Sequence, residues 1–214
     1  YNSDSGQVFS IGEKPNIAIQ NPEASVRMAL SEALLNIAGV KHEALSKITF
    51  SANWMSSTKT ADERGDLVRG VQAVSNMADA LNVSIPVGKD SLSMNVNWKK
   101  ENEEHSVTSP MTLNISSFSN VKDLNKSVTP ELSDVDSTLL HLWVHKDKYR
   151  MGGSSLFQSF KLFGGPAPDI DDVAAFKSLF DGAQKLLEDE LILAMHDISA
   201  VSYTHLRAHE TQFH

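Results

Sequence analysis

Residues 21–40 read NPEASVRMALSEALLNIAGV, and their pattern predicts one long helix with a single buried side. Asn21 suits the N-cap, and Pro22 suits the first helical turn that follows it. Apolar residues then recur at three- and four-residue spacing, as they do on one buried helical stripe. The residues of this stripe are Val26, Leu30, Ala33, Leu34 and Ile37. Gly39 marks the predicted end of the helix.

The segments on either side of this helix predict a mixture of strands and helices. A short apolar strand is predicted at residues 15–19, and a second helix at 60–81, with Asp62 and Glu63 at its positive N-terminal end. Further strands are predicted at 48–51, 83–87, 92–98 and 110–118, with a polar turn over 99–104. The fold class that follows is α+β, a mixed β-sheet with flanking helices.

A polar stretch at 123–136, which contains Pro130, predicts a domain junction. We therefore expect one domain over residues 8–137 and the incomplete start of a second α+β domain over 138–200. The second part is predicted to contain strands at 139–144 and 191–195, and helices at 154–162 and 170–187.

Composition excludes several classes of function. The chain has 214 residues, no cysteine and a formal net charge of -8, with 41% hydrophobic and 21% charged residues. Cysteine-ligated zinc and thiolate chemistry are excluded, and a reducing compartment such as the cytoplasm is the default expectation. The absence of a basic run argues against nucleic-acid binding, and no apolar run reaches the roughly 20 residues that span a bilayer.

Several segments, in order along the chain, carry a resemblance to one enzyme family. They are Gly12-Glu13-Lys14-Pro15, residues 27–38 (RMALSEALLNIA), 51–55 (SANWM), 85–94 (IPVGKDSLSM) and 196–199 (HDIS). This set, which covers about residues 8–200, resembles the large phosphoribosylformylglycinamidine synthases. The pairing of SANWM with VGKDSLSM is its most specific part.

The resemblance implies a fold, a reaction and partners. The synthetase region of this family looks like two copies of the aminoimidazole ribonucleotide synthetase fold. This chain resembles the N-terminal domain of the second copy and the start of its C-terminal domain. The family reaction uses Mg²⁺ and ATP to convert formylglycinamide ribonucleotide and glutamine to the amidine, in the cytoplasm. The first synthetase half and the glutaminase domain would be missing partners, so we expect this fragment to be inactive alone.

Two positions on the predicted helix are candidate magnesium ligands. Glu32 and Asn36 lie four residues apart, so their oxygen-bearing side chains project from one face and could reach one hard cation. Without the resemblance, such a pair is more often two solvated neighbours. The motif Ser-Glu-Ala-x-x-Asn is similar to family magnesium ligands, which favours the metal.

Asp197 follows the predicted strand at 191–195, a common place for ligand groups, although a turn-capping role is the simpler alternative. His-Asp-x-Ser resembles the metal and nucleotide motif of the family. The resemblance therefore assigns Asp197 to Mg²⁺ and Ser199 to the nucleotide.

The turn predicted at residues 88–91 offers a flexible backbone, a cation and two oxygen-bearing side chains. Lys89, Asp90 and Ser91 are therefore weaker candidates for a substrate or phosphate contact. The alternative is an ordinary turn that links two strands, because the upstream glycine of a P-loop is absent.

After Ser199 the family pattern requires an Asp-Gly-Gly turn, whereas this chain continues with residues 200–214, AVSYTHLRAHETQFH. Residues 201–214 are predicted to be a non-native tail and are excluded from the fold. His205 and His209 lie four apart, but the glutamate that a zinc protease needs directly after the first histidine is absent. We do not expect a zinc site.

Two other functions remain open at the level of the sequence. One is a noncatalytic half that holds ADP and Mg²⁺ for stability while the other copy performs the chemistry. The other is a related ATP-using synthetase of the same superfamily, against which the SANWM and VGKDS pairing argues.

Overall fold

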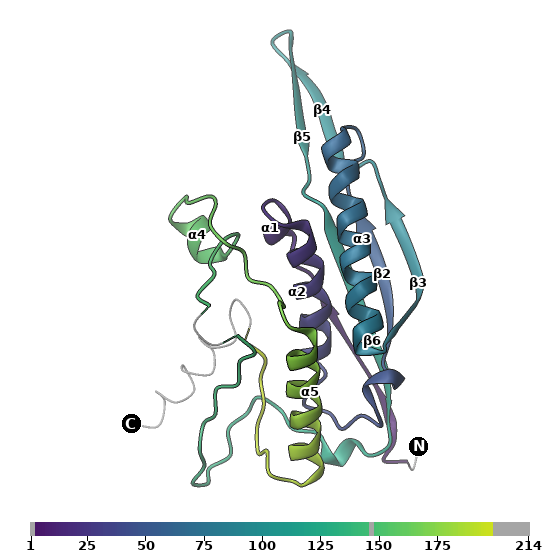
Figure 1. Ribbon diagram of the computed structural model, residues 1–214, viewed down its shortest axis with the longest axis vertical. Helices are drawn as coiled ribbons and strands as arrows, with labels where there is room; N and C mark the ends of the chain where they lie inside the picture. Colours follow the sequence, from purple (N-terminus) through teal and green to yellow (C-terminus); the bar gives the residue numbers. More distant parts are fainter. Residues whose placement is uncertain (1–2, 146–147, 199–214) are drawn as a thin grey trace.

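The computed structural model describes residues 3–145 and 148–198. At its centre lies a four-stranded mixed sheet with the strand order β1-β6-β2-β3. The strands are β1 (Gly6–Gly12), β2 (Thr49–Met55), β3 (Ser84–Ser91) and β6 (Thr112–Val121). β6 is antiparallel to both β1 and β2, and β3 is parallel to β2. Figure 1 shows α2 (Pro22–Leu35) and α3 (Ala61–Leu81) together on one face of this sheet.

The long helix forms where the sequence predicts it. Asn21 caps α2, because its side-chain oxygen accepts a hydrogen bond from the Ala24 amide at 2.8 Å. The predicted stripe faces the sheet, and all five of its residues are buried. The helix ends at Leu35, before Gly39. The chain continues through short turns, and a Cβ on Gly39 would lie 2.8 Å from Val128 O.

The second helix is also confirmed, with a sharply defined start. The Thr60 hydroxyl accepts from the Glu63 amide, and the Glu63 carboxylate accepts from the Thr60 amide, which makes a capping box. The hydrogen bonds that the Thr60 amide and the Ser57 hydroxyl donate to the Glu63 carboxylate hold its pKa below the usual value. α3 ends at Leu81, where Asn82 takes the left-handed conformation (φ 57°) that terminates many helices.

The main core lies between the sheet and the helices. Its largest fully buried side chains from these elements are Leu30 and Leu34 of α2, Phe50 of β2, Met77 and Leu81 of α3, and Leu113 and Ile115 of β6. On β2 and β6 these residues alternate with more exposed ones, as expected for a sheet covered on one side. No helix in the described parts of the chain is long and apolar enough to cross a membrane.

The region of the predicted turn at 99–104 is a hairpin that projects beyond the sheet (Figure 1). β4 (Asn95–Lys100) and β5 (Glu103–Thr108) pair antiparallel, and the turn contains only Glu101 and Asn102. Both turn residues have positive φ, 50° and 70°, as the tight two-residue hairpin turn requires. β5 was not predicted because its sequence, EEHSVT, has little strand propensity.

Two predictions near the N-terminus differ from the structure. The strand expected at 15–19 is wrong, because Pro15–Ala18 form the short helix α1, whose first position Pro15 preorganises. The strand that pairs at this edge is instead β1, which the sequence did not single out. Residues of β1 alternate in exposure but not in polarity, and the strand gains its stability from pairing with β6, 103 or more residues away.

The strands predicted at 139–144 and 191–195 are also wrong. Within the described residues 138–198 the structure contains α4 (Ser155–Ser159) and α5 (Val173–Glu188) and no strand. Leu139, Leu140 and Leu191 are about two-thirds exposed, and no strand among the described residues pairs with either segment. The division of the chain near residue 137 stays a prediction.

α5 nevertheless packs on the core of the first part. Phe176 and Phe180 are buried with the residues of α2, α3 and the sheet. Gln184 of α5 accepts from the His42 amide at 2.8 Å and donates to Ala38 O at 2.8 Å. Segments about 140 residues apart therefore share one packed and hydrogen-bonded interior.

Candidate functional site

Glu32 lies on α2 and faces the turn that joins β1 to α1. Its Oε2 accepts from the Glu13 amide at 2.8 Å, and its Oε1 pairs with the ammonium of Lys14. Both carboxylate oxygens of Glu32 are thus in contact with donors from the Gly12–Pro15 turn. A positive charge already sits on one of them.

The turn can lie close against α2 because Gly12 has no side chain. A Cβ on Gly12 would lie 2.1 Å from Ala29 O and 2.7 Å from Ala33 N. Ser25 adds a second anchor, because its hydroxyl donates to Lys14 O at 2.6 Å. The backbone of the turn is therefore fixed, while the Lys14 side chain extends from it to Glu32.

Asn36 lies one helical turn after Glu32, at the C-cap of α2. Its Nδ2 donates a hydrogen bond to Ile11 O, near the end of β1, at 3.1 Å. The carboxamide oxygen is the atom that remains for a ligand. The structure therefore places Glu32 and Asn36 together at one end of β1, as the spacing predicts.

The polar cluster extends from this turn to the centre of the sheet. Asn114 of β6 donates to Glu13 Oε2 at 3.2 Å. Asn114 pairs in register with Asn53 of β2, whose Oδ1 is buried and has no hydrogen-bond partner among the described residues. Glu13, Lys14 and Asn53 belong to the motifs that carry the family resemblance, but the sequence predicted no role for any of them. The signal that could have found them is their position, because Glu13 and Lys14 directly follow β1 and Asn53 lies within β2.

Asp197 lies in an irregular segment and contacts its own neighbour. Its Oδ1 is 2.9 Å from His196 Nδ1, and only 6% of its side chain is exposed. Met195, two residues before it, donates its amide to Thr129 O at 3.1 Å. Among the described residues, no hydrogen bond or ion pair joins Asp197 to Glu32 or Asn36. Ser199, the predicted nucleotide contact, lies outside the described residues.

Residues 88–91 form the end of β3 and not a turn, which corrects that expectation. Parallel pairing with β2 sets Lys89 beside Asn53, Asp90 beside Trp54 and Ser91 beside Met55. β3 is one of the two edge strands of the sheet, and the side chains of Lys89 and Asp90 are exposed. Lys89 Nζ reaches Ser91 Oγ at 3.5 Å. Their side chains are accessible to a ligand, but the backbone is extended.

The donor chemistry of Glu32 and Asn36 fits a hard divalent cation. A carboxylate and a carboxamide oxygen one turn apart are ligands that Mg²⁺ accepts, and Glu32 already pairs with a cation, the Lys14 ammonium. Across residues 3–145 and 148–198, no three His, Asp or Glu side chains group as a metal site. A full set of ligands therefore needs the carboxamide oxygen, water or phosphate oxygens.

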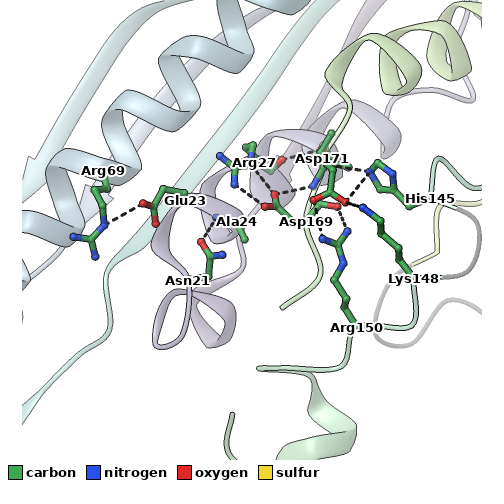
Figure 2. A network of polar contacts seen from close by, with 12 residues as sticks. Asn21, Glu23, Ala24, Arg27, Arg69, His145, Lys148, Arg150, Asp169 and Asp171 are labelled. Carbon is green, nitrogen blue, oxygen red and sulfur yellow. Dashed lines mark hydrogen bonds and ion pairs between the residues drawn. The ribbon is translucent and has the colours of Figure 1, made fainter. Parts of the chain in front are cut away.

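A second polar network fastens the segment before α5 to α2 (Figure 2). Arg27 of α2 makes two hydrogen bonds to the Asp169 carboxylate, at 2.7 and 2.6 Å. These bonds raise the pKa of the Arg27 guanidinium. Arg27 and Asp169 also line a pocket of about 420 Å³ between α2, α3 and the start of α5.

Asp171 is the other centre of this network. Lys148 and Arg150 contact its carboxylate at 2.8 and 2.9 Å, and His145 Nε2 accepts from its amide at 3.0 Å. The hydrogen bonds from Lys148 and Arg150 lower the pKa of Asp171 to about 2. The carboxylates of this network are paired with cations of the same network. It therefore attaches the segment to the fold and is not a metal site.

Comparison with known proteins is consistent with this geometry. The model of the family described as FGAR-AT PurM_N-like domain matches residues 1–120. The structure of PurL from T. maritima complexed with FGAR is 12% identical, with a TM-score of 0.60 over 92% of this chain and 30% of that chain. The mixed sheet with flanking helices is thereby confirmed as the fold.

Other matches are partial. PurL from T. maritima complexed with ADP is 19% identical, with a TM-score of 0.45 over 61% of this chain and 20% of that chain. The hydrogenase maturation protein HypE in complex with ATP is 11% identical, with a TM-score of 0.43 over 58% of this chain and 33% of that chain. The chain thus spans only 20–30% of the PurL chains that it matches.

Proposed function

The chain belongs to the family of FGAR-AT PurM_N-like domains, and on that premise we propose that it is part of the ATP-dependent ligase that forms formylglycinamidine ribonucleotide. Residues 8–137 would be the N-terminal domain of the second synthetase half, and residues 138–200 would begin its C-terminal domain. Its partners would be the first synthetase half and a glutaminase domain of the same enzyme.

The observation that carries the proposal is the position of Glu32 and Asn36 inside the matched region. Glu32 lies on α2 against the Gly12–Pro15 turn, Asn36 lies at the C-cap of α2 against Ile11, and both fall within residues 1–120. We assign the metal to Glu32, Asn36 and Asp197, and the nucleotide contact to Ser199. When bound there, Mg²⁺ would neutralise the phosphate charge of ATP or ADP.

The residues of the chain have separate tasks in this proposal. The Glu13 amide holds Glu32 Oε2 and so orients the carboxylate. Ile11 O holds the nitrogen of Asn36, which leaves the carboxamide oxygen for the ligand. Lys89, Asp90 and Ser91, on the outer strand, are weaker candidates for contact with substrate or phosphate. Such positioning of charge is the main contribution that a protein makes to phosphoryl chemistry.

A noncatalytic role, in which ADP and Mg²⁺ are held for stability, is the second candidate. It is favoured by the contacts of Glu32, which join α2 to the turn after β1. Ligand binding at Glu32 would then stabilise the connection between the sheet and its covering helix. Substitution of a metal-binding residue would remove turnover at a catalytic site, whereas at a structural site it would remove folded stability.

The sheet face that α2 and α3 leave uncovered is the proposed contact surface for the other synthetase half. Phe9 and Phe118 stack there with ring centroids 6.4 Å apart and are 70% and 47% exposed. Ile11 and Val87 are also exposed. Exposed apolar groups on a sheet face are typical of a surface that another layer covers.

Thermal unfolding of the chain with and without MgADP tests the proposed site. Wild-type protein should melt at a higher temperature as MgADP rises, because the ligand binds only the folded state. Glu32→Gln and Asp197→Asn should each remove most of this increase. Asn36→Ala should remove less of it, because the carboxamide that it deletes carries no charge. Lys126→Met, which breaks an exposed pair with Glu190, is the control. If the three site variants respond to MgADP as wild type does, the site assignment fails.

A further inference from the structure

We propose that Lys14 is a built-in competitor for the cation site, so that a divalent cation can bind Glu32 only after the Lys14 ammonium leaves. This inference rests on the proposed function, because it concerns the occupancy of the same carboxylate. It adds a residue that sets the affinity of the site and that sequence spacing alone does not indicate.

The two oxygens of Glu32 differ in the kind of donor that they contact. Oε2 accepts from the Glu13 amide, which belongs to a backbone fixed by the close approach of Gly12 to α2. Oε1 pairs with the ammonium of Lys14, at the end of a flexible side chain. One oxygen is therefore held in place and the other can exchange its partner.

The backbone of Lys14 is independent of its ion pair. Lys14 O accepts from the Ser25 hydroxyl at 2.6 Å and from the Ile17 amide at 3.2 Å, and Pro15 follows at the first position of α1. These contacts remain when the side chain turns away from Glu32. Release of the ammonium therefore does not require the turn to unfold.

The environment of the pair makes the competition measurable. Lys14 and Glu32 retain 25% and 17% side-chain exposure, so solvent reaches the pair but does not fully screen it. An ammonium at Oε1 neutralises the carboxylate and repels a second cation. Glu13 lies next in the chain, but its carboxylate accepts from Asn114 and makes no ion pair with Lys14 among the described contacts.

Titration with Mg²⁺ alone tests this inference, with calorimetry and thermal unfolding as the two measurements of binding. Lys14→Met should tighten Mg²⁺ binding about fivefold, which corresponds to about 1 kcal/mol, the upper range for an exposed ion pair. Lys14→Gln, which keeps a hydrogen-bond donor to Glu32 without the charge, should tighten it in the same direction and serves if Lys14→Met is poorly folded. A merely structural role for Lys14 would instead weaken binding in both variants.

Lys126→Met is the matched control, because it removes one positive charge and one lysine–glutamate pair elsewhere on the chain. It should leave Mg²⁺ affinity unchanged, and adding Glu32→Gln to Lys14→Met should abolish the gain. If Glu32→Gln weakens Mg²⁺ binding but neither Lys14 variant tightens it, the competition is refuted and the metal site stands. If Glu32→Gln has no effect in any background, the metal site itself is refuted, and the competition with it.

Discussion

Individual side chains in this protein serve two kinds of polar cluster with opposite chemical character. The Glu32 cluster has a carboxylate oxygen and a carboxamide oxygen oriented by backbone groups, and the cation that contacts it among the described residues is a flexible lysine. In the Asp171 cluster, two cations contact one carboxylate. The first arrangement can exchange its cation, whereas the second is neutralised within the fold.

The Asp171 cluster yields a prediction about acid stability. Lys148 and Arg150 lower the pKa of the Asp171 carboxyl from 3.8 to about 2. A lowered carboxylate pKa contributes stability above the unfolded-state pKa, and this contribution is lost as pH falls from about 4 through 2. Asp171→Asn should therefore lower the free energy of unfolding by about 1 kcal/mol at pH 7, a value reduced for solvent screening.

Chemical denaturation at a series of pH values measures this effect. The difference between Asp171→Asn and wild type should shrink as pH falls below 4 and vanish near pH 2. Asp134→Asn, at an exposed position, is the control and should show little difference at any pH. A constant difference between Asp171→Asn and wild type across this range would contradict the ion-pair explanation.

At the level of elements, small residues determine how closely α2 approaches the sheet. Gly12 of β1 leaves no room for a Cβ beside Ala29, and the Ser10 hydroxyl donates to Ala33 O at 2.5 Å. Ser117 of β6 also donates to Ala33 O, at 3.3 Å. A strand and a helix that touch through glycine, serine and alanine bring Glu32 within reach of the turn after β1.

Substitution of Gly12 tests this close packing. Gly12→Ala should destabilise the protein by about 3 kcal/mol or more, because the new Cβ would collide with backbone atoms that cannot move independently. Gly182→Ala, in the middle of α5 with open space around it, should instead stabilise by about 0.4–1 kcal/mol. Denaturant unfolding compares the two, and equal effects would show that backbone crowding at Gly12 is not the cause.

Over the whole molecule, a buried histidine links α5 to the segment that follows α2. His42 Nε2 donates to Ile37 O at 2.8 Å, and its Nδ1 accepts from the Ser119 hydroxyl at 2.9 Å. Its ring stacks on Phe180, and its amide donates to Gln184. Burial lowers the pKa of His42, with a further contribution from Lys41.

This arrangement predicts a loss of stability in mild acid. Because the folded-state pKa of His42 is lowered, the unfolded chain binds more protons, and stability falls as pH decreases below the unfolded value of 6.5. Melting temperatures measured from pH 7.5 to pH 5 should decline for wild type. His42→Gln should flatten this decline, whereas His105→Gln, on the exposed hairpin, should leave it as in wild type. A parallel decline in wild type and His42→Gln would exclude His42 as the titrating group.

The sequence by itself determined the local features, because capping residues and helical periodicity act over a few neighbours. The Asn21 cap, the stripe of α2 and the start of the second helix near residue 60 were predicted correctly, and the spacing of Glu32 and Asn36 put them on one face. Tertiary structure decided what depends on partners distant in the chain. β1 forms because β6 pairs with it, and the leucines of 139–144 form no strand because no strand lies beside them. Lys14 reaches Glu32 only because Gly12 allows the backbone to approach α2, a contact between segments that no local pattern encodes.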